Sequence, residues 1–191
     1  FVTDAESARD WIGDTVAFGA GFSDAVFLAA AYRAVSAGDA ARLAEAAELA
    51  AAFPATRELA LESHAQGRAF LAITTEAWSA PALDELRACW DGPCAYPIAV
   101  GCAAAGHGIA LADAASGYLH AFAANLVSAA VRLVPLGQTA GQRILAGLED
   151  TVAQTAARAL ETDVEEVASA TLMVDVCSMK HETQHTRLFR S

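Results

Sequence analysis

The chain has 191 residues, enough for one domain with a sizeable hydrophobic core. Hydrophobic residues make up 55% of the sequence and aromatic residues only 7%, because alanine, the strongest helix former, is so abundant. The formal net charge of −11 would repel a phosphate backbone, which argues against a nucleic-acid-binding protein.

Helix signals follow one another along the first part of the chain. Thr3-Asp4-Ala5-Glu6 has the pattern of a capping box, with Thr3 as the N-cap and Glu6 at position N3. Glycines and Pro54 then supply breaks between apolar periodic segments. The expected helices cover residues 4–18, 23–38, 39–53 and 56–78, the last with Leu59, Leu61, Phe70 and Leu71 pointing inward.

The second part of the chain continues the helical pattern after a loop-rich segment. Residues 79–97 contain three prolines and a glycine around one short helical piece, 83–90. Helix is expected over 98–134, 138–160 and 164–173, with a turn at 135–137 and no strand-length alternation anywhere. Ile144, Leu145, Leu148 and Val152 share one face of the 138–160 helix. The sequence therefore predicts an all-α, single-domain bundle of about eight to ten helices.

Two stretches without acidic or basic side chains lie on either side of Asp113 and reach Asp91 and Arg132. A membrane-spanning helix needs about 20 apolar residues. The first stretch contains several glycines and prolines, and the second contains His120 and Asn125. Central helices of a soluble bundle explain both stretches better, and we expect no membrane span.

The four cysteines do not form a C-x-x-C pair, which favours reduced thiols over a disulfide framework or a metal site. Cys102 and Cys177 stand in apolar surroundings, where cysteine behaves as a small hydrophobic residue. The helical pattern starts directly after Phe1, without a basic stretch or an apolar signal core. These features predict a cytoplasmic location.

The string His181-Glu182-Thr183-Gln184-His185 matches the H-E-x-x-H pattern of zinc proteases. A catalytic zinc also needs a third protein ligand, and residues 186–191 contain no His, Asp or Glu. An upstream ligand such as Asp175 or His120 is open, but nothing specifies it. A solvated tail helix that matches the pattern by chance is the simpler interpretation.

No other set of residues forms an active site. His64 and His107 stand in no catalytic pattern, and a phosphate-binding loop with a lysine is missing. Gly137 and Gly141 fit G-x-x-x-G, which in a soluble helix permits close backbone packing. We therefore expect a protein that is not an enzyme and that has no resident cofactor.

Positive charge is concentrated at the C-terminus of this acidic chain. Lys180, Arg187 and Arg190 alternate there with Leu188 and Phe189. Such a segment is either a frayed end or a docking peptide, in which arginines donate forked hydrogen bonds and the hydrophobic side chains fill a partner's pocket.

Two long motifs carry a resemblance to a known family. The first is the run 125–139, NLVSAAVRLVPLGQT, continued by Gly141-Gln142; the second is SMKHETQ at 178–184, followed by RLFRS at 187–191. Weaker similarity occurs at Val2-Thr3-Asp4 with Trp11, and at Thr56-Arg57-Glu58 with Ser63, Gln66 and Gly67. The chain thereby resembles the urease accessory protein UreF family, which usually has tyrosine where this sequence has His185.

The resemblance implies an all-α, dimer-forming chaperone of metallocentre assembly that is not an enzyme. Proteins of this family bind a sheet-rich accessory protein and recruit a nickel-binding GTPase for GTP-dependent nickel insertion into apo-urease. Their C-terminal motif becomes ordered against the sheet-rich partner. A generic all-helical interaction module and, more remotely, a zinc-dependent hydrolase are the alternatives.

The resemblance also assigns candidate docking residues. It divides the chain into a helical core, 1–176, and a C-terminal docking tail, 177–191. In the tail the docking residues are Arg187, Leu188, Phe189 and Arg190, with His181, Glu182 and Gln184 as a supporting polar layer. Lys180 is a further partner-binding candidate. A second set, Arg132, Gln138, Gln142 and Arg143, comes from the other long motif, where these residues either meet a partner or only hold the turn.

Overall fold

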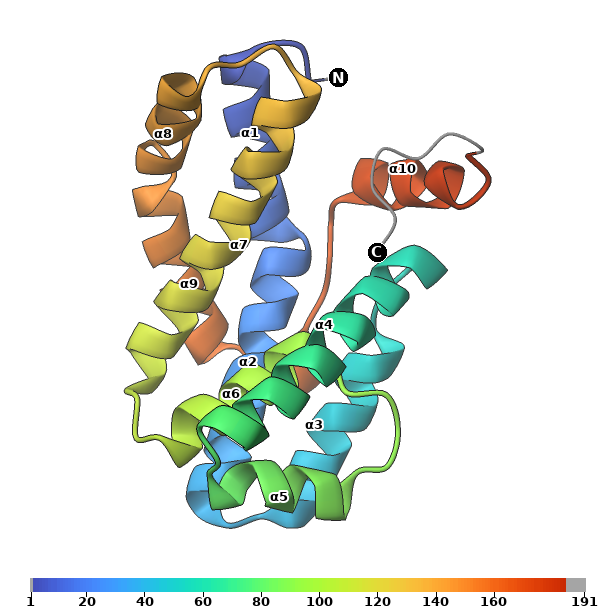
Figure 1. The fold of residues 1–191 in the computed structure, drawn as a ribbon, viewed down its shortest axis with the longest axis vertical. Helices are drawn as coiled ribbons and strands as arrows, with labels where there is room; N and C mark the ends of the chain where they lie inside the picture. Colours follow the sequence, from blue (N-terminus) through green and yellow to red (C-terminus); the bar gives the residue numbers. More distant parts are fainter. Residues whose placement is uncertain (1, 185–191) are drawn as a thin grey trace. The chain divides into compact units, whose positions relative to one another are not determined.

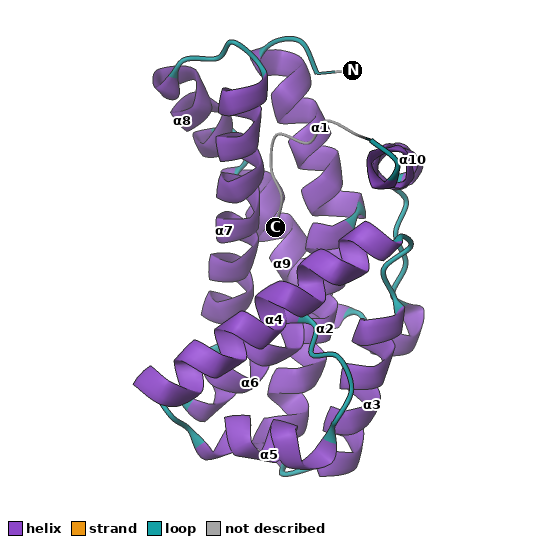
Figure 2. Cartoon of the chain, turned by 45° about the vertical axis from the view of Figure 1, so that its right-hand side comes forward, coloured by secondary structure: helices purple, strands orange, loops and turns teal. Residues whose placement is uncertain are grey.

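The computed structural model describes residues 2–184, and within this range every regular element is a helix (Figure 2). The elements are α1 (Ala5–Phe18), α2 (Ala20–Ala37), α3 (Ala40–Ala52), α4 (Arg57–Ala77), α5 (Pro81–Cys89), α6 (Tyr96–Gly106), α7 (Leu111–Leu133), α8 (Gln138–Ala146), α9 (Glu149–Glu161), a 3₁₀ turn (Val164–Glu166) and α10 (Leu172–Glu182). The predicted all-α class is confirmed.

The described residues form two compact units. The first consists of 2–26 and 112–171, and the second of 27–111 and 172–184. The division between a core and a tail that the sequence predicts at residues 176 and 177 falls inside α10. The boundary between a core, 1–176, and a docking tail, 177–191, stays a prediction.

The first unit is organised around one hydrophobic cluster that α1, α7, α8 and α9 share. Its largest members include Ile12, Leu119, Ile144 and Leu148, each at most 4% exposed. Burying one such side chain contributes about 1.5–3 kcal/mol. The predicted inward face of the 138–160 segment is confirmed, because Val152 belongs to the same cluster and Leu145 packs against it.

The cap of α1 lies one residue later than predicted. Asp4, and not Thr3, is the N-cap: its carboxylate accepts a hydrogen bond from the Ser7 amide at 2.9 Å, and the Ser7 hydroxyl accepts one from the Asp4 amide. The bond from the Ser7 amide also lowers the pKa of Asp4. Aspartate caps a helix as well as a hydroxyl does, so the sequence pattern allowed both registers.

The expected single helix over 138–160 is wrong. The chain breaks at Gly147 and Leu148, which separates α8 from α9 and places the Leu148 side chain in the cluster. Glu149 and Asp150 then stand in the first turn of α9, where the helix dipole favours acidic side chains.

The predicted close packing at the G-x-x-x-G pattern is confirmed for one of its glycines. A Cβ at Gly141 would lie 2.8 Å from Val131 Cγ2, so this glycine lets α8 approach α7. Gly137 has no neighbouring atom near that position.

A helix over 164–173 is also wrong. Only the 3₁₀ turn forms, and the chain beyond it is irregular until α10 begins at Leu172. The backbone amide of Ala170 donates to the Phe18 carbonyl at 2.8 Å instead of entering a helix of its own. A contact with the end of α1 therefore replaces local helix formation here.

The second unit is built on the packing of α4, α5 and α6. Gly67 of α4 lies so close to the backbone of Cys94 and Ala95 that a Cβ would collide with it. The Ser63 hydroxyl accepts a hydrogen bond from the Tyr96 amide at 3.2 Å, and the rings of Phe70 and Tyr96 meet edge to face. These contacts fix α4 on α6.

One sequence expectation fails in the second unit. Leu61 was expected to point inward but is 61% exposed. Helix dominates residues 98–134 as the sequence predicts, in the two helices α6 and α7, and Gly108 adopts a left-handed backbone (φ 68°) that ends α6 before α7 begins.

The stretch Ala5–Ala37, made of α1 and α2, is long and apolar enough to cross a membrane by length and composition. However, 61% of its most apolar window is buried inside the protein, as in a core helix. Sequence analysis also considered the uncharged stretch between Asp113 and Arg132 as a membrane span. Helix α7, which contains this stretch, is not among the described helices that are long and apolar enough to cross a membrane.

Candidate functional site

The C-terminal helix α10 belongs to the second unit and lies against α4 (Figure 1). Val174, Ser178 and His181 are half-buried and follow one another at intervals of four and three residues, which places them on one face of the helix. Asp175 and Val176 are half-buried as well, and no residue of α10 is fully buried. The helix therefore lies on the surface of its unit.

Two side-chain contacts join this face to the N-terminal end of α4. The hydroxyls of Ser178 and Thr56 are hydrogen-bonded at 2.7 Å, and His181 Nδ1 contacts Glu58 Oε2 in an ion pair when the imidazole is protonated. Thr56 is also the N-cap of α4, where its hydroxyl oxygen accepts a hydrogen bond from the Leu59 amide. We call Thr56 and Glu58 the α4 anchor.

This geometry changes the interpretation of the H-E-x-x-H string. His181 is engaged with Glu58, whereas Glu182 is exposed, and His185 lies outside the described residues. Within residues 2–184, no group of three or more His, Cys, Asp or Glu side chains is arranged to hold a metal ion.

The predicted docking residues of the C-terminal segment are only partly described. Lys180, Glu182 and Gln184 are exposed, and His181 is half-buried against α4. The four residues expected to make the main docking contacts, Arg187, Leu188, Phe189 and Arg190, lie outside the described residues.

The second predicted set surrounds the turn between α7 and α8, in the first unit. Arg132 precedes the turn and donates from Nε to the Ser128 carbonyl at 3.1 Å. Gln138, Gln142 and Arg143 are exposed on α8. The four side chains thus border one helix–turn–helix, and they belong to a different unit from the C-terminal segment.

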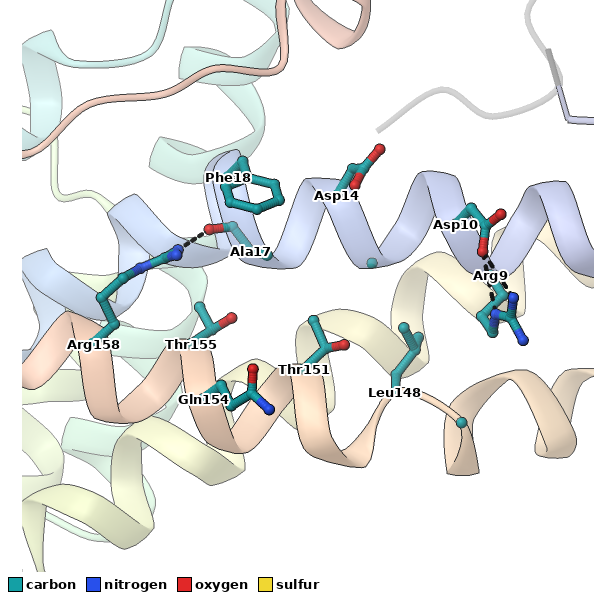
Figure 3. Close-up of a pocket in the computed structure, with 12 residues that line it drawn as sticks. Arg9, Asp10, Asp14, Ala17, Phe18, Leu148, Thr151, Gln154, Thr155 and Arg158 are labelled. Atoms are coloured by element: carbon teal, nitrogen blue, oxygen red, sulfur yellow. Dashed lines mark hydrogen bonds and ion pairs between the residues drawn. The ribbon is translucent and has the colours of Figure 1, made fainter.

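A groove that the sequence did not predict runs between α1 and α9 of the first unit (Figure 3). Its cavity volume is about 540 Å³. At one end, Arg158 donates a hydrogen bond to the carbonyl of Ala17, and its guanidinium carbon lies 4.3 Å from the ring centre of Phe22 and 5.5 Å from that of Phe18. These contacts explain Arg158 as a residue that secures the end of α1.

Two of the four cysteines are poor nucleophiles at neutral pH because they are largely buried. Burial raises the pKa of the Cys94 thiol to about 11 and raises that of Cys102 further, which keeps both protonated at neutral pH. Cys177 was expected in apolar surroundings but is exposed. His107 is exposed as well, and its Nε2 is hydrogen-bonded to the Trp78 carbonyl at 3.0 Å. Nε2 of His64 is buried and has no hydrogen-bond partner among residues 2–184.

Sequence comparison decides the family. The UreF family model matches residues 2–149. The chain is 50% identical over 190 residues to a protein of Rhodopseudomonas palustris (strain BisA53) described as "Urease accessory protein UreF", covering all of this chain and 80% of that protein. A Bradyrhizobium diazoefficiens protein of the same description is 49% identical over 190 residues. That alignment covers all of this chain and 78% of the Bradyrhizobium protein. The chain belongs to the UreF family of urease accessory proteins.

Membership confirms the resemblance drawn from the two long motifs, and with it the expectation of an accessory protein that is not an enzyme. The interpretation of H-E-x-x-H as a catalytic zinc site is therefore wrong. The family model ends at Glu149, the first residue of α9, but the alignments with the relatives span 190 of the 191 residues and so include the C-terminal segment.

Sequence analysis missed the residues to which the C-terminal segment is attached. Thr56 and Glu58 carried a weak part of the family resemblance, yet neither was among the candidate docking residues. The available signal was that both segments, 56–58 and 178–184, carried part of the family resemblance, and the fold brings them together.

Proposed function

We propose that this chain is a scaffold in the maturation of urease. In this proposal it binds a sheet-rich accessory protein and recruits a nickel-binding GTPase, which together deliver nickel, as cargo, into apo-urease in a GTP-dependent step. Membership of the UreF family is the observation that carries the proposal. The protein would act in the cytoplasm, as a homodimer.

The C-terminal segment is the proposed dock for the sheet-rich partner. Its exposed Lys180 is followed by Arg187 and Arg190, which supply positive charge in a chain whose net charge is −11. Arginine donates hydrogen bonds in a planar fork, so it suits partner carboxylates and carbonyl groups. Leu188 and Phe189 would fill apolar pockets between these polar contacts.

The α7–α8 turn is the proposed second contact surface. Exposed Gln138, Gln142 and Arg143 offer hydrogen-bond donors on one short helix, and Leu133 beside the turn is 57% exposed. A large exposed hydrophobic side chain among polar donors is typical of the centre and rim of an interface. If these residues only hold the turn, their removal will change stability and leave partner binding unchanged.

Co-elution with the sheet-rich accessory protein and the GTPase on a sizing column tests the proposal. We expect a stable ternary complex that is lost when residues from Arg187 onward are removed. The double variant Phe189→Ala with Arg190→Ala should fold normally and bind the sheet-rich protein at least about thirtyfold more weakly, as loss of one interface hot spot of 2 kcal/mol would give.

A matched control variant removes one exposed hydrophobic side chain and one arginine side chain from α3, away from the proposed dock. Leu49→Ala with Arg42→Ala, both on α3, should leave capture unchanged. If the Phe189/Arg190 variant binds as well as the wild type, the C-terminal dock is wrong. If all folded partners fail to associate with the wild-type chain, the scaffold function itself is wrong and a generic helical interaction module replaces it.

A further inference from the structure

The predicted docking residue His181 has two uses that exclude each other. In the structure its imidazole Nδ1 contacts Glu58 of the α4 anchor, and its side chain is half-buried against α4. The family resemblance places the same side chain in the polar layer that meets the sheet-rich partner. One ring nitrogen cannot bond to α4 and to the surface of another protein at the same time. One of the two contacts therefore has to be given up for the other.

Ser178 belongs to the same motif and is held in the same way. Its hydroxyl is hydrogen-bonded to the Thr56 hydroxyl at 2.7 Å. Ser178 and His181 are three residues apart, so they lie on one face of α10, and this face is turned to α4. While α10 lies on α4, the anchor covers these two side chains of the motif.

Helix α10 can leave α4 at a small cost in free energy. It has 11 residues, none of which is fully buried, and Met173 and Met179 are exposed. Isolated helices shorter than about 12–15 residues are marginal in water. Segments with few buried apolar contacts open locally while the rest of the protein stays folded. Release of α10 therefore does not require unfolding of the second unit.

The α4 anchor, in contrast, stays in place when α10 leaves. Thr56 is 6% exposed and caps α4, and α4 is fixed on α6 through Gly67 and Ser63. Glu58 stands in the first turn of α4, where the helix dipole favours a carboxylate. The anchor is thus a permanent site to which α10 can return.

We propose that the α4 anchor makes an autoinhibitory contact: Thr56 and Glu58 hold Ser178 and His181, and these two side chains become available to the sheet-rich accessory protein only when α10 leaves α4. The inference rests on the proposed C-terminal dock. It agrees with a motif that becomes ordered against its partner, because the contacts with the anchor are exchanged for contacts with the partner. The anchor then sets how readily the chain captures that partner.

The sign of the effect is the decisive prediction. Only the released fraction of molecules binds, so the apparent affinity is reduced by that fraction, and a weaker anchor raises it. For Glu58→Ala we expect about fivefold tighter capture, mainly through faster association. Ser178→Ala, which leaves the Thr56 cap of α4 in place, should act in the same direction. Contacts that helped docking would give weaker capture instead.

Matched controls remove the same groups elsewhere in the second unit. Glu62→Ala removes an exposed carboxylate one turn further along α4, where it is hydrogen-bonded to Gln66. This control is needed because loss of a negative charge can by itself change the association rate. Ser36→Ala removes a hydroxyl that is bonded within α2. Both should bind the partner as the wild type does.

A reversible lock tests the contact in the opposite direction. The hydroxyl oxygens of Thr56 and Ser178 are 2.7 Å apart, so cysteines at these positions bring two sulfur atoms within reach of a disulfide. Thr56→Cys with Ser178→Cys is made together with Cys177→Ser, which removes the exposed neighbouring thiol. After mild oxidation, capture should be at least about tenfold weaker than after reduction with dithiothreitol. Both states share the altered cap of α4, so the comparison isolates the lock, and mass spectrometry verifies the disulfide.

Association and dissociation rates with the sheet-rich accessory protein, measured on the full chain, separate the outcomes. Tighter capture by Glu58→Ala and Ser178→Ala, with loss of capture in the locked chain, supports the inference. Unchanged or weaker capture by both variants overturns it, and so does a locked chain that binds as well as the reduced one. In these cases the wild type still binds, and the proposed function stands. If neither the wild type nor the released variants bind, the proposed function fails and the inference fails with it.

Discussion

Helices α9 and α10 have similar lengths, 13 and 11 residues, but the protein holds them in opposite ways. Helix α9 buries Val152, Thr155, Ala156 and Ala159, three of them in the cluster of the first unit. Helix α10 has no fully buried residue, and its contacts with α4 include two polar ones at the α4 anchor. Burial of apolar surface makes a helix part of the cooperative fold, whereas a few exposed polar contacts leave it able to open locally.

This difference suits the two regions to different tasks. The cluster residues of the first unit must stay packed in every functional state. A docking segment has to exchange its contacts for those of a partner, and such segments come from the low-stability end of a structure. The following predictions separate the two kinds of attachment.

The largest effect is expected from matched leucines in the two regions. Leu119 of α7 is fully buried in the cluster, and Leu172 of α10 is 69% exposed. Leu119→Ala should lower the free energy of unfolding by about 2–5 kcal/mol, because it removes buried methyl groups and leaves a cavity. Leu172→Ala should change it by less than about 0.5 kcal/mol. Urea unfolding of both variants measures the difference, and equal losses would refute the division between core and attached helix.

The buried cluster of the first unit is also the part that the sequence predicted best. Ile144, Leu148 and Val152 follow the helical period, so their common inward face was readable even though the chain breaks at Gly147. Periodicity reports which face is apolar, but not where neighbouring elements interrupt the helix. The helix expected over 164–173 failed for this reason, since Ala170 bonds to the distant Phe18 carbonyl.

The candidate site could be predicted only in part. The two long motifs identified the family and placed docking residues at the C-terminus. The contact between Thr56 and Ser178 joins positions 122 residues apart in the chain. No local pattern encodes such a pair, because either hydroxyl would suit a solvent-exposed helix end equally well. The anchor therefore required the fold.

Within the second unit, the rate of thiol alkylation should distinguish the largely buried cysteines Cys94 and Cys102 from the exposed Cys177 of α10. Because burial raises the pKa of Cys94 to about 11, its thiolate fraction at pH 8 should be about a hundredfold smaller than that of an unburied cysteine. Mass spectrometry after brief alkylation at pH 8 should show modification of exposed Cys177 and almost none of Cys94 or Cys102.

The pH dependence gives this comparison a direction. Raising the pH from 8 to 10 should accelerate alkylation of Cys94 about tenfold per pH unit, since the thiolate is the reacting form and the pKa lies above this range. If Cys94 reacts as fast as Cys177 already at pH 8, the loop between α5 and α6 opens readily and the unit is less tightly packed there than we infer.

The smallest of these effects concerns the polar contact that α9 itself makes. Arg158 donates to the Ala17 carbonyl at the end of α1 and lies over Phe22. Arg158→Ala should destabilise the chain by about 1–2 kcal/mol, because solvent weakens both the exposed charged hydrogen bond and the partly exposed cation–π contact below their usual sum. Arg143→Ala, on the exposed face of α8, should cost less than about 0.5 kcal/mol.

Arg158→Lys keeps the charge but loses the planar group that stacks on the ring, so it should recover only part of the stability. Equal stability of Arg158→Ala and Arg143→Ala in urea unfolding would mean that burial alone holds α9. The contrast with α10, where polar contacts carry the attachment, would then be sharper still.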